Sequence, residues 1–322
     1  MPSQLTTASN FPAGFNNVTI RGIPLTQAHP GQVFWVSNAT PTLPGQIGGS
    51  DGNPGTFNAP FSTLDYAVGR CTASRGDIIF VKPGHAETYS AASALALDIA
   101  GVAVIGLGQG SLRPTFTCDT VNTTPIVVSA ANVSIVNCLF VANFLTIAAA
   151  IHASTASYLT VQNCEAQDTS AAKNFANFVK STGAANTVDG LAVIDCFYGS
   201  IGTTFNTFIL TANDINGLQV LRNTVLSINT TDLAALVIVS AGVLTNGLMS
   251  DNSTKRKNTT SSAALVSVGG TTSSVIMLDN FTSTLDASGN VNWAVTTGLV
   301  GAGNSYSGAI AGQGFPIPAL DT

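Results

Sequence analysis

The sequence contains few charged residues. Only 8% of its 322 residues are charged, with eleven Lys and Arg against sixteen Asp and Glu. Soluble domains usually have about a quarter of their residues charged, so we expect part of this surface to be covered by other protein. The scarcity of basic residues and the net charge of −5 exclude an extended nucleic-acid-binding face. We interpret the basic cluster Lys255-Arg256-Lys257 as a solvated turn; the alternative is a docking contact for an acidic partner.

Other absences limit the compartment and the chemistry. No run of eighteen apolar residues occurs, so we expect no membrane span and no membrane partner. The N-terminus Met1-Pro-Ser-Gln lacks the basic and apolar regions of a signal peptide, which predicts synthesis in the cytoplasm. The three His and five Cys show no metal-ligand spacing, so we expect no metal and no cofactor. Buried reduced thiols are favoured over disulfides.

The chain does contain an internal repeat of about 28 residues. Seven short apolar runs end on a Cys or an Asn, at intervals of 26, 32, 27, 29, 28 and 24 residues. These end positions are Cys138, Cys164, Cys196, Asn223, Asn252, Asn280 and Asn304. A period of this length predicts a solenoid in which each coil stacks on the next. A second series of apolar runs, such as Ala235–Val239 and Leu265–Val268, predicts at least two strands per coil.

The end positions of the repeat predict an internal ladder. Strand alternation turns the first and third residues of each run inward, and a bend brings the sixth inward as well. Asn suits this place because it tolerates a left-handed backbone and its amide can bond to the same residue in adjacent coils. Cys at the same place would be a small apolar plug.

This ladder resembles that of the right-handed parallel β-helix in the pectin-lyase-like superfamily, and of bacteriophage virion proteins with that fold. The likeness covers roughly residues 75–305 and implies an all-β solenoid. A short helix is expected before it, with Ser62 and Asp65 as a capping box. We therefore predict an extended arm at 1–54, a capping-helix region at 55–74, the β-helix at 75–305 and a C-terminal cap at 306–322. We interpret residues 171–180 as an enlarged turn outside the stack.

Apolar residues also occupy outward positions of the predicted strands. They are Val136, Ile194, Leu221, Leu248, Ile276 and Leu278. Exposed side chains of this size would make a large sticky surface, so we expect the face to be an interface in a parallel homotrimer. The N-terminal arm is the alternative cover.

Three carboxylates are the candidates for catalysis. Asp195, Asp251 and Asp279 precede ladder positions, and paired carboxylates on adjacent coils could form an acid/base or calcium site. Because Arg222 falls within the same column, we favour a surface charge ladder. His85 with Glu87, and His152, are interpreted as structural.

The resemblance and the missing catalytic cluster together favour a non-enzymatic bacteriophage virion protein. We expect a homotrimeric capsid decoration or minor capsid protein that binds the major capsid protein at the capsid surface. The alternative is a tailspike-like receptor-binding protein with polysaccharide-binding or depolymerase activity. A secreted lyase of the plant-polysaccharide type is the third hypothesis.

Overall fold

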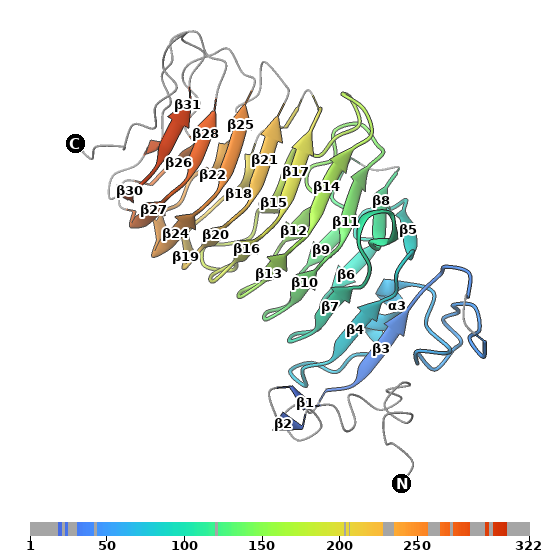
Figure 1. The fold of residues 1–322 in the computed structure, drawn as a ribbon. Coiled ribbons are helices and arrows are strands. Elements are labelled where there is room, and N and C mark those ends of the chain that lie inside the picture. Colours follow the sequence, from blue (N-terminus) through green and yellow to red (C-terminus); the bar gives the residue numbers. More distant parts are fainter. Residues whose placement is uncertain are drawn as a thin grey trace.

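The computed structural model shows a solenoid of stacked coils whose ends lie far apart (Figure 1). It describes residues 19–20, 23–24, 31–41, 44–119, 122–202, 204–205, 207–227, 235–256, 265–270, 273–283, 294–295 and 299–307. Most of the expected N-terminal arm before residue 31, the C-terminal cap after residue 307 and Lys257 lie outside these residues. Among the described helices, none is long and apolar enough to cross a membrane.

Three parallel sheets form the walls of the solenoid. Sheet 1 has ten strands in the order β3 (Val33–Val36), β4 (Ile78–Val81), β7 (Ala103–Gly106), β10 (Ser134–Val136), β13 (Thr160–Gln162), β16 (Ala192–Ile194), β20 (Gln219–Leu221), β24 (Gly247–Ser250), β27 (Val275–Leu278) and β30 (Leu299–Ala302). Sheet 2 has nine strands in the order β5 (Ala86–Tyr89), β8 (Thr115–Cys118), β11 (Leu139–Ala142), β14 (Glu165–Asp168), β17 (Phe197–Ser200), β21 (Thr224–Ser227), β25 (Ser253–Arg256), β28 (Phe281–Ser283) and β31 (Ser305–Ser307).

Sheet 3 completes each coil before the chain returns to sheet 1. Its eight strands are β6 (Leu95–Leu97), β9 (Ile126–Val128), β12 (Ile151–Ala153), β15 (Asn177–Ser181), β18 (Thr207–Thr211), β22 (Ala235–Val239), β26 (Val266–Val268) and β29 (Ala294–Val295). Shorter elements are the pair β1 (Thr19–Ile20) and β2 (Ile23–Pro24), the pair β19 (Ile215–Asn216) and β23 (Leu244–Thr245), and the 3-10 helix η1 (Gly110–Leu112). Each coil thus has a third strand beyond the two series of apolar runs seen in the sequence, and the predicted all-β parallel solenoid is confirmed.

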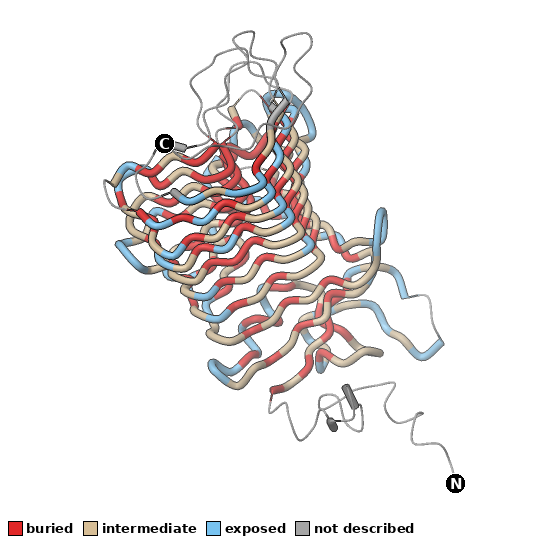
Figure 2. Tube along the Cα trace, turned by 60° about the vertical axis from the view of Figure 1, so that its left-hand side comes forward, coloured by how far each residue is buried: buried red, intermediate tan, exposed pale blue. Residues whose placement is uncertain are grey.

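The strands stack in register, so equivalent residues face the same side in every coil. Ile135 lies opposite Val161, which lies opposite Val193, and all three are buried. Buried positions alternate with less buried ones along many strands (Figure 2). This alternation places one continuous apolar core between the three sheets and leaves the intervening side chains on the outer walls.

The ladder residues lie inside the turn from sheet 1 to sheet 2. Cys138, Cys164 and Cys196 are buried free thiols, and the asparagines beyond them are equally buried. From Asn223 onward each amide bonds to the next: Asn223 Nδ2 donates to Asn252 Oδ1 at 3.0 Å, and Asn252 Nδ2 donates to Asn280 Oδ1 at 2.8 Å.

Our conformational reason for Asn in the ladder was wrong. The left-handed backbone belongs to the residue immediately before each ladder position, as in Asn163 (φ 52°), Asp195 (φ 54°) and Arg222 (φ 53°). Asn therefore occupies the ladder because its amide bonds to adjacent coils. The turn residue before it bears the backbone strain.

The solenoid begins within the expected arm. Strand β3 pairs in parallel with β4, so the first coil starts at Val33, well before residue 75. The loop after β3 covers the free edge of this strand, with Trp35 N donating to Gly55 O at 2.8 Å and Phe61 N donating to Trp35 O at 2.9 Å. Bare strand edges promote aggregation, and this loop protects the first one.

A short helix, α3 (Leu64–Gly69), covers the same end of the core. Its N-cap is Thr63, whose hydroxyl accepts from Tyr66 N, so the expected cap at Ser62 was wrong by one residue. Asp65, expected in the capping box, instead accepts from the main-chain N–H of Ala96 at 3.0 Å on the edge strand β6.

Residues 171–180 were wrongly interpreted as an enlarged turn outside the stack. Their second half begins β15, and Phe175 and Phe178 are fully buried. The Phe178 ring stacks on Phe208 one coil away, with centroids 4.8 Å apart. Phe175 and Phe178 are therefore core residues of the solenoid and not part of an outer turn.

Candidate functional site

A pocket of about 350 Å³ lies where the loops between sheets 2 and 3 meet the outer wall of sheet 3. His152 of β12 and Lys180 of β15 lie side by side on this wall, because their strands pair in register. The other lining residues are Asn122, Thr123, Thr124, Ala148 and Thr182. Four of these five carry a hydroxyl or an amide, which suits a ligand rich in hydroxyl groups.

The electrostatics of the pocket are set by one cation beside one imidazole. Burial, together with the positive charge of Lys180, lowers the pKa of His152. The ring is therefore neutral at neutral pH, and its Nε2 lies 3.0 Å from Thr182 Oγ1. Lys180 forms no ion pair with any residue that the structure describes. The pocket thus offers a positive charge next to a group that can accept a proton.

No carboxylate lines this pocket. Glycoside hydrolysis usually requires two carboxylates on either side of the scissile bond, so the pocket does not have the groups for that reaction. Within the described part of the chain, no cluster of three His, Cys, Asp or Glu side chains could hold a metal ion.

The three predicted catalytic carboxylates lie elsewhere, in the turns between sheets 1 and 2. Asp195 forms an exposed ion pair with Arg222, with Oδ1 2.7 Å from Nε. Hydrogen bonds from Arg222 lower the pKa of Asp195. Asp251 and Asp279 have left-handed backbones, like the other residues of this column. The turn geometry accounts for their identity, since Asp and Asn tolerate this conformation.

His85 and Glu87 are both occupied with structural hydrogen bonds at the N-terminal end. His85 is fully buried; its Nδ1 accepts from Asn38 N at 3.1 Å and its Nε2 lies 3.1 Å from Glu87 Oε2. The same Glu87 oxygen accepts from Leu64 N at the start of α3. This pair links the first coils to the helix.

Asp168 is a buried carboxylate that our sequence analysis did not single out. Its oxygens accept from Tyr198 OH at 3.0 Å, from Ser200 Oγ at 2.8 Å and from the main-chain N–H groups of Ile201 and Gly202. Burial raises the pKa of Asp168. Because its oxygens already accept this many bonds, its role is to hold the loop after β17.

The outward apolar residues form two columns on sheet 1. One contains Leu248 and Ile276, continued by Val300, and the other contains Val136, Ile194, Leu221 and Leu278. Gln162 and Ser250 interrupt the second column. Ile276 is 47% exposed and Val300 59% exposed, whereas the remaining predicted interface residues are half-buried.

No protein-family model and no curated protein matches the sequence. Among solved structures, a pectin methylesterase in complex with a hexasaccharide is 14% identical over 85% of this chain and 90% of that chain, with a TM-score of 0.42. A rhamnogalacturonan lyase is 14% identical over 85% and 88%, with a TM-score of 0.33. The tailspike protein of E. coli bacteriophage HK620, in complex with a pentasaccharide, is 11% identical over 76% of this chain and 50% of that chain, with a TM-score of 0.42.

These likenesses concern the fold alone. The fold is an all-β parallel solenoid, as the pairing of its own strands shows. The similar proteins bind or degrade polysaccharides, and one of them is a phage tailspike.

The comparisons overturn our expectation that the chain is not an enzyme. Proteins similar in fold include a rhamnogalacturonan lyase, a pectin methylesterase and a pectate lyase. A solenoid fold by itself does not decide between an enzyme and a structural protein. What this chain binds has to be argued from its own pocket.

Proposed function

We propose that the protein binds an acidic polysaccharide on the outer wall of sheet 3, as a tailspike-like receptor-binding protein would. The observation that carries this proposal is the ammonium of Lys180, which forms no ion pair with any described residue. It lies beside His152, whose lowered pKa keeps it neutral, in a pocket with several hydroxyl and amide side chains. A half-buried cation gains most from a ligand carboxylate, through a charge-assisted hydrogen bond. The hydroxyls of Thr123 and Thr124 and the amide of Asn122 can pair with sugar hydroxyls, while Thr182 Oγ1 bonds to His152.

The same two groups support one reaction, β-elimination from a uronate. Lys180 neutralises the carboxylate, and His152 accepts the proton from the carbon next to it. The bond from the adjacent carbon to the glycosidic oxygen then breaks, a carbon–carbon double bond forms, and the leaving oxygen takes a proton from solvent. A neutral imidazole is the required state of the base, and the lowered pKa of His152 maintains it.

The test compares polygalacturonate with an uncharged polysaccharide, by calorimetric titration and by the ultraviolet absorbance of an unsaturated product. We expect polygalacturonate to bind and the uncharged polysaccharide not to bind. Lys180→Met should weaken the binding of polygalacturonate at least about tenfold, or 1.4 kcal/mol. Lys173→Met is the matched control, since that lysine bonds to Asn143 and does not line the pocket. Equal binding by the Lys180 variant and the native protein would refute the proposal.

A role in the virion is a second candidate, and the apolar columns of sheet 1 favour it. Exposed Ile276 and Val300 would be covered in a parallel homotrimer. Such a trimer could decorate the capsid by binding the major capsid protein. Sedimentation at several concentrations tests the assembly, and titration of undecorated capsids tests the docking. A protein that stays monomeric and binds no capsid would rule out this role.

A further inference from the structure

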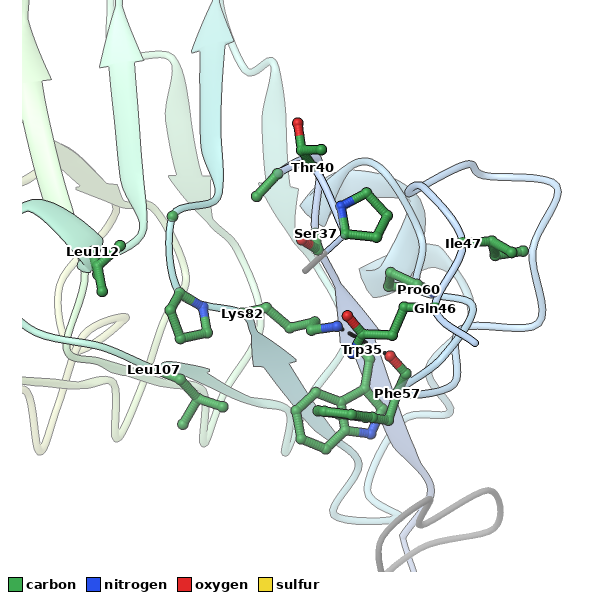
Figure 3. Close-up of a pocket in the computed structure, with 14 residues that line it drawn as sticks. Trp35, Ser37, Thr40, Gln46, Ile47, Phe57, Pro60, Lys82, Leu107 and Leu112 are labelled. Carbon is green, nitrogen blue, oxygen red and sulfur yellow. Dashed lines mark hydrogen bonds between the residues drawn. The ribbon is translucent and has the colours of Figure 1, made fainter. Parts of the chain in front are cut away.

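A second pocket, of about 490 Å³, lies at the N-terminal end of the solenoid (Figure 3). The loop that follows β3 forms one side, with Gln46, Ile47 and Phe57, and the segments carrying Lys82, Leu107 and Leu112 form the other. Trp35 lies between them; its ring packs edge-on against Phe57, with centroids 5.0 Å apart. This pocket belongs to the outer wall of sheet 1 and is separate from the pocket of Lys180.

Lys82 is the one charged residue that lines the pocket. Its Nζ donates to Phe57 O at 3.1 Å and lies 4.4 Å from the centre of the Phe57 ring. No carboxylate within the described residues forms an ion pair with it. Burial lowers the pKa of Lys82, because the charged ammonium is less well solvated in the pocket than in water. An ammonium has three N–H donors, so contacts with one carbonyl and one ring leave it able to bind a ligand carboxylate as well.

The rest of the lining is largely apolar. Leu112 is 56% exposed and Ile47 is 53% exposed, and they stand on opposite rims of the pocket. Large aliphatic side chains this exposed gain from being covered by a ligand. Ser37 is buried, so Thr40, Gln46 and Lys82 are the polar side chains of the lining that a ligand can reach. An apolar body fits this lining better than a carbohydrate.

We propose that this pocket binds a ligand that carries a carboxylate on an apolar body, with the carboxylate placed on Lys82. The ion pair would give the half-buried ammonium a carboxylate, which it lacks among the described residues, and the apolar body would cover Leu112 and Ile47. Two sources share this chemistry, a small organic acid and an acidic side chain within an apolar peptide. The inference does not depend on the proposed polysaccharide site.

The experiment titrates the full chain with 3-phenylpropionate, with its uncharged amide, and with a capped Leu-Pro-Phe-Asp peptide. Binding is followed by calorimetry and by tryptophan fluorescence, since Trp35 lines the pocket. We expect at least one acid to bind and the amide to bind at least about tenfold more weakly. If only 3-phenylpropionate binds, the natural ligand is a small organic acid; if only the peptide binds, it is an acidic side chain within an apolar peptide.

The variants separate this pocket from any other anion site. Lys82→Met should abolish binding and Lys82→Arg should retain it, whereas Lys173→Met, at a lysine that lines neither pocket, should leave it unchanged. Leu112→Asp, on the exposed rim, should weaken binding by repulsion without disturbing the core, and it tests the site even where Lys82→Met fails to fold. Failure of both acids to bind, equal binding of the amide, or binding unaffected by both Lys82→Met and Leu112→Asp would overturn the proposal.

Discussion

The two halves of the internal ladder fill the same place with different chemistry. In the N-terminal half, the Sγ of Cys196 donates to Ile194 O at 3.3 Å and to Val161 O at 3.5 Å. Thiols are weak donors and acceptors, so this half is held mainly by packing. In the C-terminal half, Asn252 and its neighbours form a chain of amide hydrogen bonds of 2.8 to 3.0 Å.

The comparison shows that burial alone does not determine the residue at this position. Asn252 Oδ1 accepts from both the main-chain N–H and the Nδ2 of Asn223, and its own Nδ2 donates to Val220 O and Asn280 Oδ1. A buried amide with all its bonds satisfied is stabilising, whereas one with missing partners is costly. The asparagine half should therefore be the more sensitive to substitution.

Breaking the amide chain should have the largest effect. Asn252→Cys leaves the main-chain N–H and one Nδ2 hydrogen of Asn223 without their acceptor, and Asn280 Oδ1 loses one of its two bonds from residue 252. We expect a loss of roughly 3 to 5 kcal/mol in the free energy of unfolding, at about 1 to 3 kcal/mol for each unsatisfied group. Urea unfolding followed by circular dichroism measures it. A loss below about 1 kcal/mol would mean that the amide chain does not stabilise this half.

Alkaline pH should destabilise the cysteine half selectively. Burial raises the pKa of Cys118 to about 12 from the ordinary 9.0. Between these values the unfolded chain loses the thiol proton while the folded chain keeps it, so stability falls as pH rises, by about 1.4 kcal/mol per pH unit for one such thiol. All five cysteines lie between residues 71 and 196.

Hydrogen exchange, resolved by segment, tests this asymmetry. Raising the pH above 9.0 should open the coils around Cys118 before those around Asn252. The Cys118 thiol should also resist alkylation until the protein unfolds, since burial keeps it protonated and inaccessible. Uniform opening of both halves would contradict the expected difference.

Extending the amide chain by one coil should have a small effect. Cys196 N already donates to Asn223 Oδ1 at 2.9 Å, so an amide at position 196 could donate to the same oxygen. We expect Cys196→Asn to change the free energy of unfolding by less than about 1 kcal/mol, far less than the reverse exchange at Asn252. A loss as large as that of Asn252→Cys would show that the cysteine coils cannot accommodate an amide.

The smallest expected effect is at the junction of the two halves. Arg222 has a left-handed backbone (φ 53°), which costs an ordinary residue about 1 to 2 kcal/mol. Arg222→Asn should relieve part of this strain and lose only an exposed ion pair with Asp195, for a net gain of about 0.5 kcal/mol. A thermal unfolding curve measures the change, and a decrease in stability would mean that the ion pair outweighs the strain.

The sequence predicted the coils and the ladder because both depend on a repeated pattern of side chains. It assigned the left-handed turn to the wrong residue, since Asn163 and Cys164 are neighbours and only the backbone shows which one is left-handed. The N-cap was missed by one residue for a similar reason, because Ser62 and Thr63 are both suitable caps.

The candidate site was harder to predict. His152 has no charged neighbour in the sequence, and its partner Lys180 lies one coil away on the wall of sheet 3. Lys180 also lies at the end of the segment that we interpreted as a turn. Alignment of the second series of apolar runs, which places positions 152 and 180 in register, was the signal that could have found the pair.

A crystal structure with an acidic oligosaccharide tests the polysaccharide proposal most directly. We predict that a galacturonate unit occupies the wall of sheet 3, with its carboxylate within hydrogen-bond distance of Lys180 Nζ and a carbon-bound hydrogen facing His152. An oligosaccharide bound on another wall, or a complex in which Lys180 faces only solvent, would contradict this account of the site.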